Sequence, residues 1–270
     1  MTTSHPTAAM AKRTYLKNAL DRGEAGIGMW LTMPGGQLAK TIATIPGFNW
    51  ILIDAEHGAI TDADYYDLNQ HITAEGISPI IRIPADEPWM IKRALDSGAH
   101  GIMVPMCHDG EQAARIASAS KYAPQGTRGC GSPFTQQIFG VPEATYEAEC
   151  NANLVTIVQI ESAAGVENVQ AIAATKDIDV LFVGPFDLAK SMDVPFGGEE
   201  HEAAIASVLK ATHAAGKKAA IFCMDGAQAA RRIDQGFDAA SIATDTDSLM
   251  REFARQLDAV GQRKTKKNKA

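Results

Sequence analysis

The sequence predicts a single-domain α/β protein with the (β/α)8 barrel, or TIM barrel, fold. Eight short, nearly uninterrupted apolar runs alternate with segments of helical periodicity, and Gly, Pro or charged residues bound each run. Strands that are apolar throughout indicate a parallel sheet that is covered on both faces. Eight strand–helix units favour closure of that sheet into a barrel, with a doubly wound open sheet as the alternative.

The eight apolar runs are the expected strands. They span residues 25–31, 49–54, 78–83, 101–106, 154–160, 180–184, 218–222 and 238–243.

The intervening helices are indicated by residues typical of helix ends. Thr61 and Asp64 resemble a capping box before a helix that Gly76 ends. Pro88 lies near the first turn of the next helix, and Asp109 is a natural N-cap for the one after it. Further helices are expected within residues 162–177, 199–216, 225–236 and 245–261.

Residues 124–153 form the longest region without a clear pattern. A long loop in a compact barrel is more often functional than idle. Its GTRGCG segment, residues 126–131, could bring backbone N–H groups close to an anion, and an ordinary tight turn is the alternative.

Residues 1–23 are expected to form an N-terminal helix, residues 24–260 the barrel, and residues 261–270 a basic disordered tail. The net charge of −7 disfavours nucleic-acid binding. No apolar stretch reaches the roughly 20 residues of a membrane span, and the N-terminus lacks the apolar run of a signal peptide. We therefore expect a cytoplasmic protein, whose four cysteines, none in a CxxC pair, are free thiols.

Two carboxylates occur where consecutive predicted strands end, at the rim where barrels of this kind carry their sites. Glu161 follows the fifth strand, and Asp187 follows the sixth. Carboxylates crowded together resist joint ionisation unless a cation lies between them, and a hard divalent ion prefers oxygen ligands. The pair therefore indicates a site for Mg²⁺ or Mn²⁺, with Co²⁺ as a further candidate. Helix capping by Glu161 and loop hydrogen bonds by Asp187 are the alternative.

Further polar residues are expected at the same rim. Asp54 ends the second strand, and His57 follows it as a candidate base that Asp54 could orient. Arg82, near the end of the third strand, could stabilise an enolate, or it could form a structural ion pair with Asp54 or Glu56. Gln159 shares its strand face with Glu161.

The lysines argue for metal-dependent chemistry. A Schiff-base aldolase needs a lysine deep on a strand. Lys217 and Lys218 lie at the start of the seventh strand, and Lys190 lies beyond the sixth. None is well placed, so a metal is expected to activate the substrate.

Several motifs resemble those of the HpcH/HpaI aldolase family, the pyruvate-type class II aldolases of the phosphoenolpyruvate/pyruvate barrel superfamily. The resemblance covers roughly residues 24–255. The motifs are DAEHG (54–58), IIRIP (80–84), GIMVPM (101–106), YAPQGTRGCG (122–131), VQIES (158–162) and FVGPFDLA (182–189).

The resemblance implies a role for each rim residue. His57, paired with Asp54, would be the base, and Arg82 would bind the keto oxygen and steady the enolate. Glu161 and Asp187 would hold the metal, and Gln159 would help to position the substrate. The backbone N–H groups of Phe186 and Asp187 would hold the pyruvate carboxylate. The family also implies a homo-oligomer, typically a hexamer built as a trimer of dimers that exchange their last barrel helix.

The implied activity is that of a divalent-metal-dependent aldolase, which cleaves or forms 4-hydroxy-2-oxo acids through a pyruvate enolate and an aldehyde. An oxaloacetate decarboxylase or an enolate-trapping synthase on the same site is the alternative, and an acyl-CoA lyase or a non-catalytic barrel is more distant. The chain departs from the usual family pattern at Gly58–Ile60, at Phe186 and at residues 241–249, which leaves the aldehyde acceptor open.

Overall fold

The predicted barrel is confirmed by the structure, a computed structural model that describes residues 10–267, with the backbone alone from 262 to 267. Eight parallel strands pair in chain order, and β1 closes the barrel against β8. Each strand begins and ends within two residues of its prediction. The strands are β1 (Gly26–Leu31), β2 (Trp50–Asp54), β3 (Ser78–Arg82), β4 (Gly101–Val104), β5 (Val155–Ile160), β6 (Val180–Val183), β7 (Lys218–Ile221) and β8 (Ala239–Thr244).

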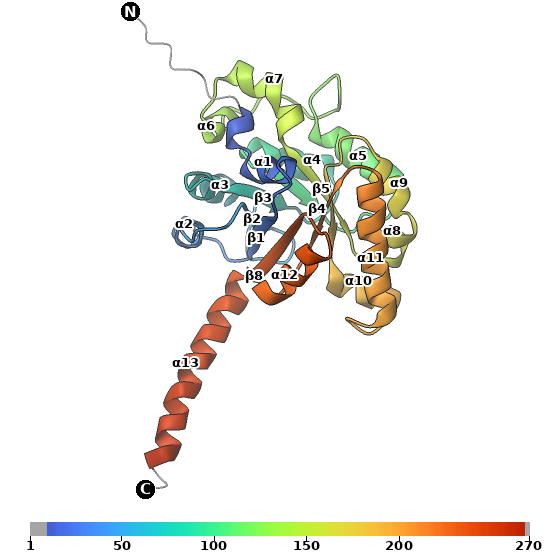
Figure 1. Cartoon of the computed structure of the whole chain (residues 1–270). Coiled ribbons are helices and arrows are strands. Elements are labelled where there is room, and N and C mark those ends of the chain that lie inside the picture. Colours follow the sequence, from blue (N-terminus) through green and yellow to red (C-terminus); the bar gives the residue numbers. More distant parts are fainter. Residues whose placement is uncertain (1–9, 268–270) are drawn as a thin grey trace, which may run out of the picture.

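Helices surround the barrel (Figure 1). The helices that match a predicted segment are α3 (Tyr65–Thr73), α4 (Pro88–Asp96), α5 (Gly110–Ser120), α8 (Ala163–Glu167), α9 (Val169–Ala174), α11 (Glu199–Ala214), α12 (Gly226–Asp234) and α13 (Asp245–Lys267). The patterns did not predict α2 (Gly36–Ala43), α6 (Thr135–Phe139), α7 (Glu143–Asn153) or α10 (Pro185–Met192). The N-terminal helix is the 3₁₀ turn Met10–Arg13 followed by α1 (Tyr15–Asp21), and residues 1–9 of that prediction lie outside the described residues.

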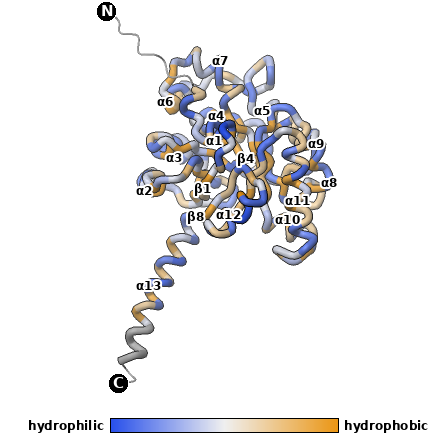
Figure 2. Tube along the Cα trace, in the orientation of Figure 1, coloured by the Kyte–Doolittle hydropathy of each residue, from blue (hydrophilic) through white to orange (hydrophobic). Residues whose placement is uncertain are grey.

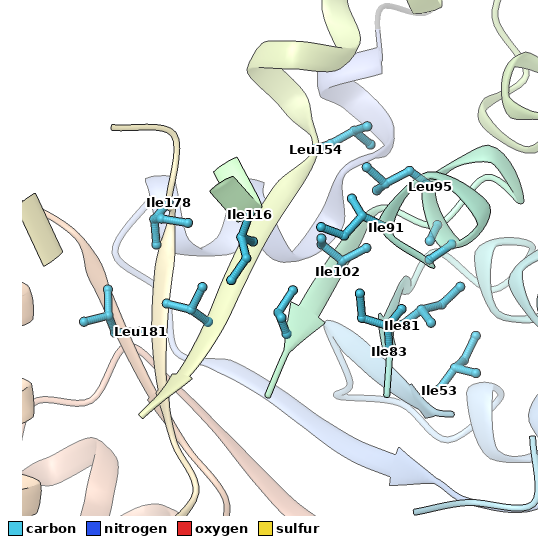
Figure 3. Close-up of a cluster of buried hydrophobic side chains, with 14 of the residues drawn as sticks. Ile53, Ile81, Ile83, Ile91, Leu95, Ile102, Ile116, Leu154, Ile178 and Leu181 are labelled. Atoms are coloured by element: carbon cyan, nitrogen blue, oxygen red, sulfur yellow. The ribbon is translucent and has the colours of Figure 1, made fainter. Parts of the chain in front are cut away.

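The interior of the barrel is filled by alternate strand residues. Trp50 and Leu52 of β2, Ile80 of β3 and Ile157 of β5 are buried in one inner cluster, which also contains Leu16 of α1. The intervening residues face outward and pack against the helices, as Ile53, Ile81 and Ile102 do in Figure 3. This period-2 alternation decides which side chains reach the inside of the barrel at its rim.

The segment 124–153 is more regular than was expected. It contains α6 and α7, which lie at the end of the barrel opposite α10 and α13 (Figure 1). The Arg128 guanidinium is buried there, 2.8 Å from the Asp96 carboxylate and 4.6 Å from the Tyr122 ring centre. The Arg128 side chain therefore serves packing. The backbone N–H groups of Gly126, Thr127 and Arg128 donate to the carbonyl groups of Tyr122, Ser118 and Lys121, so this half of GTRGCG forms the ordinary turn that was the alternative.

His100 is a fully buried histidine at the same end as α7. Its Nδ1 lies 3.0 Å from the Ser78 hydroxyl, and its ring stacks on Phe139 at 4.6 Å. Its Nε2 has no hydrogen-bond partner among the described residues. Burial and, to a lesser extent, the charge of Arg13 lower the pKa of His100 to about 3, so the ring is neutral in the fold.

The last helix, α13, leaves the barrel instead of covering it (Figure 1). All side chains from residue 248 to residue 261 are exposed. Five of these exposed side chains are large and apolar: Leu249, Met250, Phe253, Leu257 and Val260. Figure 2 shows that apolar and polar positions alternate along the helix. Residues 261–267 continue this helix, so the expected disordered tail does not begin at residue 261.

Two other expectations concern the whole chain. The four cysteines are free, with Cys107, Cys150 and Cys223 buried and Cys130 exposed. Within the part of the chain that the structure describes, no helix has both the length and the apolar character to cross a membrane.

Candidate active site

The inward alternation of three strands brings polar side chains to the carboxyl end of the barrel. Asp54 follows Trp50 and Leu52 on the inner face of β2, and it is in register with Arg82 of β3. Gln159 follows Ile157 on β5 in the same way. These three side chains therefore form the top layer of a barrel whose lower layers are apolar.

Arg82 is held by buried partners. Its Nε and Nη2 donate to the two oxygens of Asp54 at 2.9 and 2.7 Å, which is a bidentate ion pair. Its Nη1 lies 2.9 Å from a carboxylate oxygen of Glu56 and 3.4 Å from the side-chain oxygen Oε1 of Gln159. The guanidinium also lies over the Trp30 ring at 4.4 Å. Both interpretations of Arg82 are therefore compatible with its position: it forms the ion pairs, and it lines the pocket.

His57 is not oriented by Asp54 in the way that was expected. Asp54 accepts a hydrogen bond from the backbone N–H of His57 at 3.3 Å, and its remaining contacts are with Arg82 and the N–H of Glu56. The carboxylate nearest the imidazole belongs to Glu56, 3.8 Å from Nε2. Since the His57 side chain is 68% exposed, the ring reaches the open side of the pocket.

Glu161 is a buried carboxylate in the pocket. One oxygen accepts from the backbone N–H of Met106 at 2.8 Å, and the other accepts from the Gln159 amide at 3.0 Å. Met106 presents this N–H from a left-handed backbone conformation, with φ of 53°. Burial is the main cause that raises the pKa of Glu161 to about 7; the hydrogen bond from Met106 opposes this shift, and the charge of Glu56 adds to it.

Asp187 lies in the first turn of α10, beside Glu161. Gly184 is the N-cap of this helix and Pro185 its first residue. A Cβ on Gly184 would lie 2.2 Å from a carboxylate oxygen of Glu161, so only glycine leaves room for that side chain. The N–H groups of Phe186 and Asp187 have no acceptor within the helix, and such groups at a helix N-terminus favour an anion.

The charges at this rim suit a divalent cation. Four carboxylates interact here with the guanidinium of Arg82: Asp54, Glu56, Glu161 and Asp187. The site therefore has an excess of negative charge. Among the described residues, no three or more His, Cys, Asp or Glu side chains are grouped to hold an ion. Two carboxylates with open positions for water and substrate oxygens are nevertheless a common arrangement for Mg²⁺. The donor set therefore fits the expected metal.

The structure brings all of the predicted site residues into one pocket of about 260 Å³: Asp54, His57, Arg82, Gln159, Glu161, Phe186 and Asp187. Sequence reasoning missed other residues that line it: Trp30, Thr32, Phe222 and Thr244. Trp30 could have been found, because it belongs to a predicted strand that points alternate residues inward.

A further residue missed from the sequence supports the wall of this pocket. Asp245, the first residue of α13, is buried. Its carboxylate accepts from the N–H groups of Thr32 and Met33 at 3.0 Å and from the Thr32 hydroxyl at 2.6 Å. The loop after β1 is therefore attached to the start of the last helix.

Comparison with known proteins gives a consistent result. The model of the HpcH/HpaI aldolase/citrate lyase family matches residues 26–251. The chain is 38% identical to a hydroxypyruvate/pyruvate aldolase of Chromohalobacter salexigens over 90% of its length and 95% of the relative's. These matches confirm the enzyme class expected from the motifs, a carbon–carbon lyase of the aldolase type.

Solved structures agree with these matches. A HpcH/HpaI aldolase/citrate lyase family protein from Burkholderia cenocepacia superimposes with a TM-score of 0.84 at 34% identity, covering 92% of this chain and 99% of that one. Macrophomate synthase superimposes with a TM-score of 0.83 at 26% identity, covering 100% of this chain and 96% of that one. The chain belongs to the HpcH/HpaI aldolase/citrate lyase family.

Proposed function

We propose that the chain is a divalent-metal-dependent pyruvate aldolase that cleaves and forms 4-hydroxy-2-oxo acids. The observation that carries the proposal is that Glu161, Asp187, Arg82 and His57 line one pocket at the carboxyl ends of the strands. A cation held by Glu161 and Asp187 would supply Lewis-acid polarisation of the 2-oxo group. Mg²⁺ or Mn²⁺ as that cation, and a cytoplasmic location, stay predictions.

The remaining side chains account for binding. The N–H groups of Phe186 and Asp187, at the start of α10, suit the carboxylate of the 2-oxo acid. Arg82 suits the keto oxygen, because its ion pair with Asp54 fixes the guanidinium where negative charge develops on that oxygen. Gln159 connects Arg82 to Glu161 by hydrogen bonds and so fixes their relative positions.

His57 would serve as the base in the cleavage direction. It removes the proton from the 4-hydroxyl group, directly or through water, while the C3–C4 bond breaks. The bonding electrons pass to the keto oxygen, which gives the pyruvate enolate and releases the aldehyde. Protonation of the enolate at C3 gives pyruvate. In synthesis, C3 attacks the aldehyde carbon, and His57 returns the proton to the new hydroxyl group.

Oxaloacetate decarboxylation distinguishes the role of His57 from that of the residues that stabilise the enolate. Loss of CO₂ yields the same enolate, but there is no hydroxyl proton for His57 to remove. We expect His57→Ala to reduce aldol cleavage at least about 100-fold and to reduce oxaloacetate decarboxylation far less. Equal losses in the two assays would refute the base assignment. Glu161→Ala should abolish the metal-dependent activity, and full turnover in a buffer freed of divalent metal would refute the metal site.

An enolate-trapping synthase is the second candidate. The similarity over the whole chain to a protein named macrophomate synthase favours it. Pyruvate formation from oxaloacetate, with no product from any aldehyde in a panel, would favour an oxaloacetate decarboxylase or such a synthase over the aldolase.

We further propose that two copies exchange α13. The helix exposes five large apolar side chains on its own barrel, and the last three residues of β8 are only half-buried, whereas β2 to β6 are buried throughout. The helix of a second copy would bury both apolar surfaces, at roughly 25 cal/mol per Å² removed from water. A monomeric mass in solution at micromolar concentration would refute the exchange. Assembly into a hexamer stays a prediction.

A further inference from the structure

A second cavity lies beside the catalytic pocket. Its volume is about 530 Å³, and Phe186 lines both spaces. The catalytic pocket, at about 260 Å³, is smaller than the roughly 300–1,000 Å³ typical of sites for drug-sized ligands. It suits a unit of the size of pyruvate, so a bulky group on the other half of a substrate needs neighbouring space.

The ring of Phe186 forms the partition between the two spaces. On one side it meets Phe222, a wall of the catalytic pocket, edge-on at 5.9 Å. On the other side it stacks on Phe196, a wall of the second cavity, at 4.7 Å. The two stacked rings remain 44% and 47% exposed. Large apolar side chains that stay exposed together next to a reaction site mark a binding surface.

A buried histidine fixes this pair of rings. His201 Nδ1 accepts from the N–H of Gly197 at 3.0 Å, so its Nε2 carries the proton and donates to the Pro185 carbonyl at 2.8 Å. His201 thereby ties the loop that carries Phe196 to the start of the helix that carries Phe186, and its own ring contacts Phe196 at 5.2 Å. The aromatic wall is held in place before any ligand binds.

The lining of the second cavity is mainly apolar, with charge at two positions only. Five of its residues are apolar: Phe186, Ala189, Val194, Pro195 and Phe196. The other two, Lys190 and Asp193, carry opposite charges, and neither has an ion-pair partner among the described side chains. A carboxylate on the ligand would be attracted by one and repelled by the other. The apolar surface therefore dominates recognition.

We propose that this cavity receives the substituent of the aldehyde half and selects aldehydes that carry an apolar, ring-sized group. The inference rests on the proposed aldolase function and names its acceptor class. Burial of a phenyl group against Phe196 should raise kcat/KM at least about tenfold over an acceptor that has no such group.

The test compares three aldehydes with pyruvate, using the full chain with Mg²⁺ or Mn²⁺. Phenylacetaldehyde carries the ring, glycolaldehyde carries only a hydroxyl group, and succinic semialdehyde carries a carboxylate. Oxaloacetate decarboxylation is measured in parallel, because it reports enolate formation without an acceptor. We expect phenylacetaldehyde to have the highest kcat/KM.

Phe196→Ala should lower kcat/KM for phenylacetaldehyde about tenfold and leave glycolaldehyde addition and oxaloacetate decarboxylation unchanged. Phe134→Ala is the matched control, because Phe134 is a phenylalanine of similar exposure, 50%, outside both cavities. As a readout that does not depend on turnover, saturation-transfer NMR with 2-phenylethanol should detect binding to the wild type and not to Phe196→Ala.

Two results would overturn the inference while leaving the proposed function intact. One is equal kcat/KM for phenylacetaldehyde and glycolaldehyde with normal decarboxylation. The other is a preference for succinic semialdehyde that Lys190→Met removes, which would assign the cavity to anionic acceptors. Absence of both decarboxylation and aldol addition with either cation would instead refute the proposed function, and this inference with it.

Discussion

The close approach of Gly184 to Glu161 allows the proposed metal ligand to be displaced without being removed. In Gly184→Ala the new Cβ would lie 2.2 Å from a Glu161 oxygen and 2.9 Å from its Cβ. The backbone at this position has φ of −94° and ψ of 90°, a conformation that alanine adopts readily. The substitution should therefore displace the carboxylate and, because Glu161 Cβ is fixed to the backbone after β5, also shift that backbone by a few tenths of an ångström.

The expected effect follows from the distances. Ordinary contact begins at 3.4 Å, so the carboxylate must move by about 1 Å. It cannot do so freely, because hydrogen bonds from Met106 and Gln159 hold both oxygens. A misplacement of about 1 Å at a reaction site can reduce the rate about 100-fold, which corresponds to about 2.7 kcal/mol in the barrier.

The assay combines oxaloacetate decarboxylation, Mn²⁺ binding by calorimetry and thermal unfolding. We expect Gly184→Ala to lose about 100-fold in kcat and to bind Mn²⁺ more weakly, while it still unfolds in one cooperative transition at a somewhat lower temperature. Gly226→Ala is the control: it introduces the same methyl group after β7, and its Cβ would meet no atom within 4 Å. Wild-type kcat and Mn²⁺ affinity in Gly184→Ala would refute the position assigned to the metal.

Three further predictions concern stability and assembly. Asp54→Ala removes the bidentate partner of Arg82 and leaves Glu56 as its remaining carboxylate. The free energy of unfolding in urea should therefore fall by roughly 1–3 kcal/mol, and an unchanged value would contradict this. His100 has a folded pKa of about 3 against 6.5 when unfolded, so its contribution is present above pH 6.5 and is lost as the pH falls toward 3. Between pH 8 and pH 5 the wild type should lose roughly 2 kcal/mol more than His100→Gln, and parallel pH profiles would exclude this role. Phe253→Glu with Leu257→Glu should convert the oligomer into single copies in light scattering, and an unchanged mass would argue against exchange of α13.

The barrel and the chemistry of its rim could be predicted because both depend on short-range patterns. Apolar runs located the strands, and alternation along them explains why Asp54 and Gln159 face inward. The ion pair of Arg82 with Asp54 or Glu56 was among the interpretations, and the structure shows that Arg82 contacts both carboxylates. The partner of His57 could not be predicted in this way, because only the three-dimensional structure shows that Glu56 lies nearest its ring.

The parts that sequence reasoning missed depend on contacts between distant segments. Phe196 and Phe186 meet because His201 joins their segments, and nothing local to either phenylalanine indicates this. The helical periodicity of residues 245–261 predicted a helix correctly, but periodicity carries no information about whether the helix packs on its own barrel. The exposure of Phe253 supplied that information.

The bond between Asp245 and the loop after β1 gives the proposed exchange a catalytic consequence. The residue that begins α13 holds Thr32, and Thr32 lines the reaction pocket. A helix that is tethered at one end by its own pocket and docked along its length on another copy would transmit any separation of the copies to both pockets. Dilution should therefore lower the specific activity over the same concentration range in which the particle mass falls. The exchanged oligomer, and not the monomer, would then be the active form.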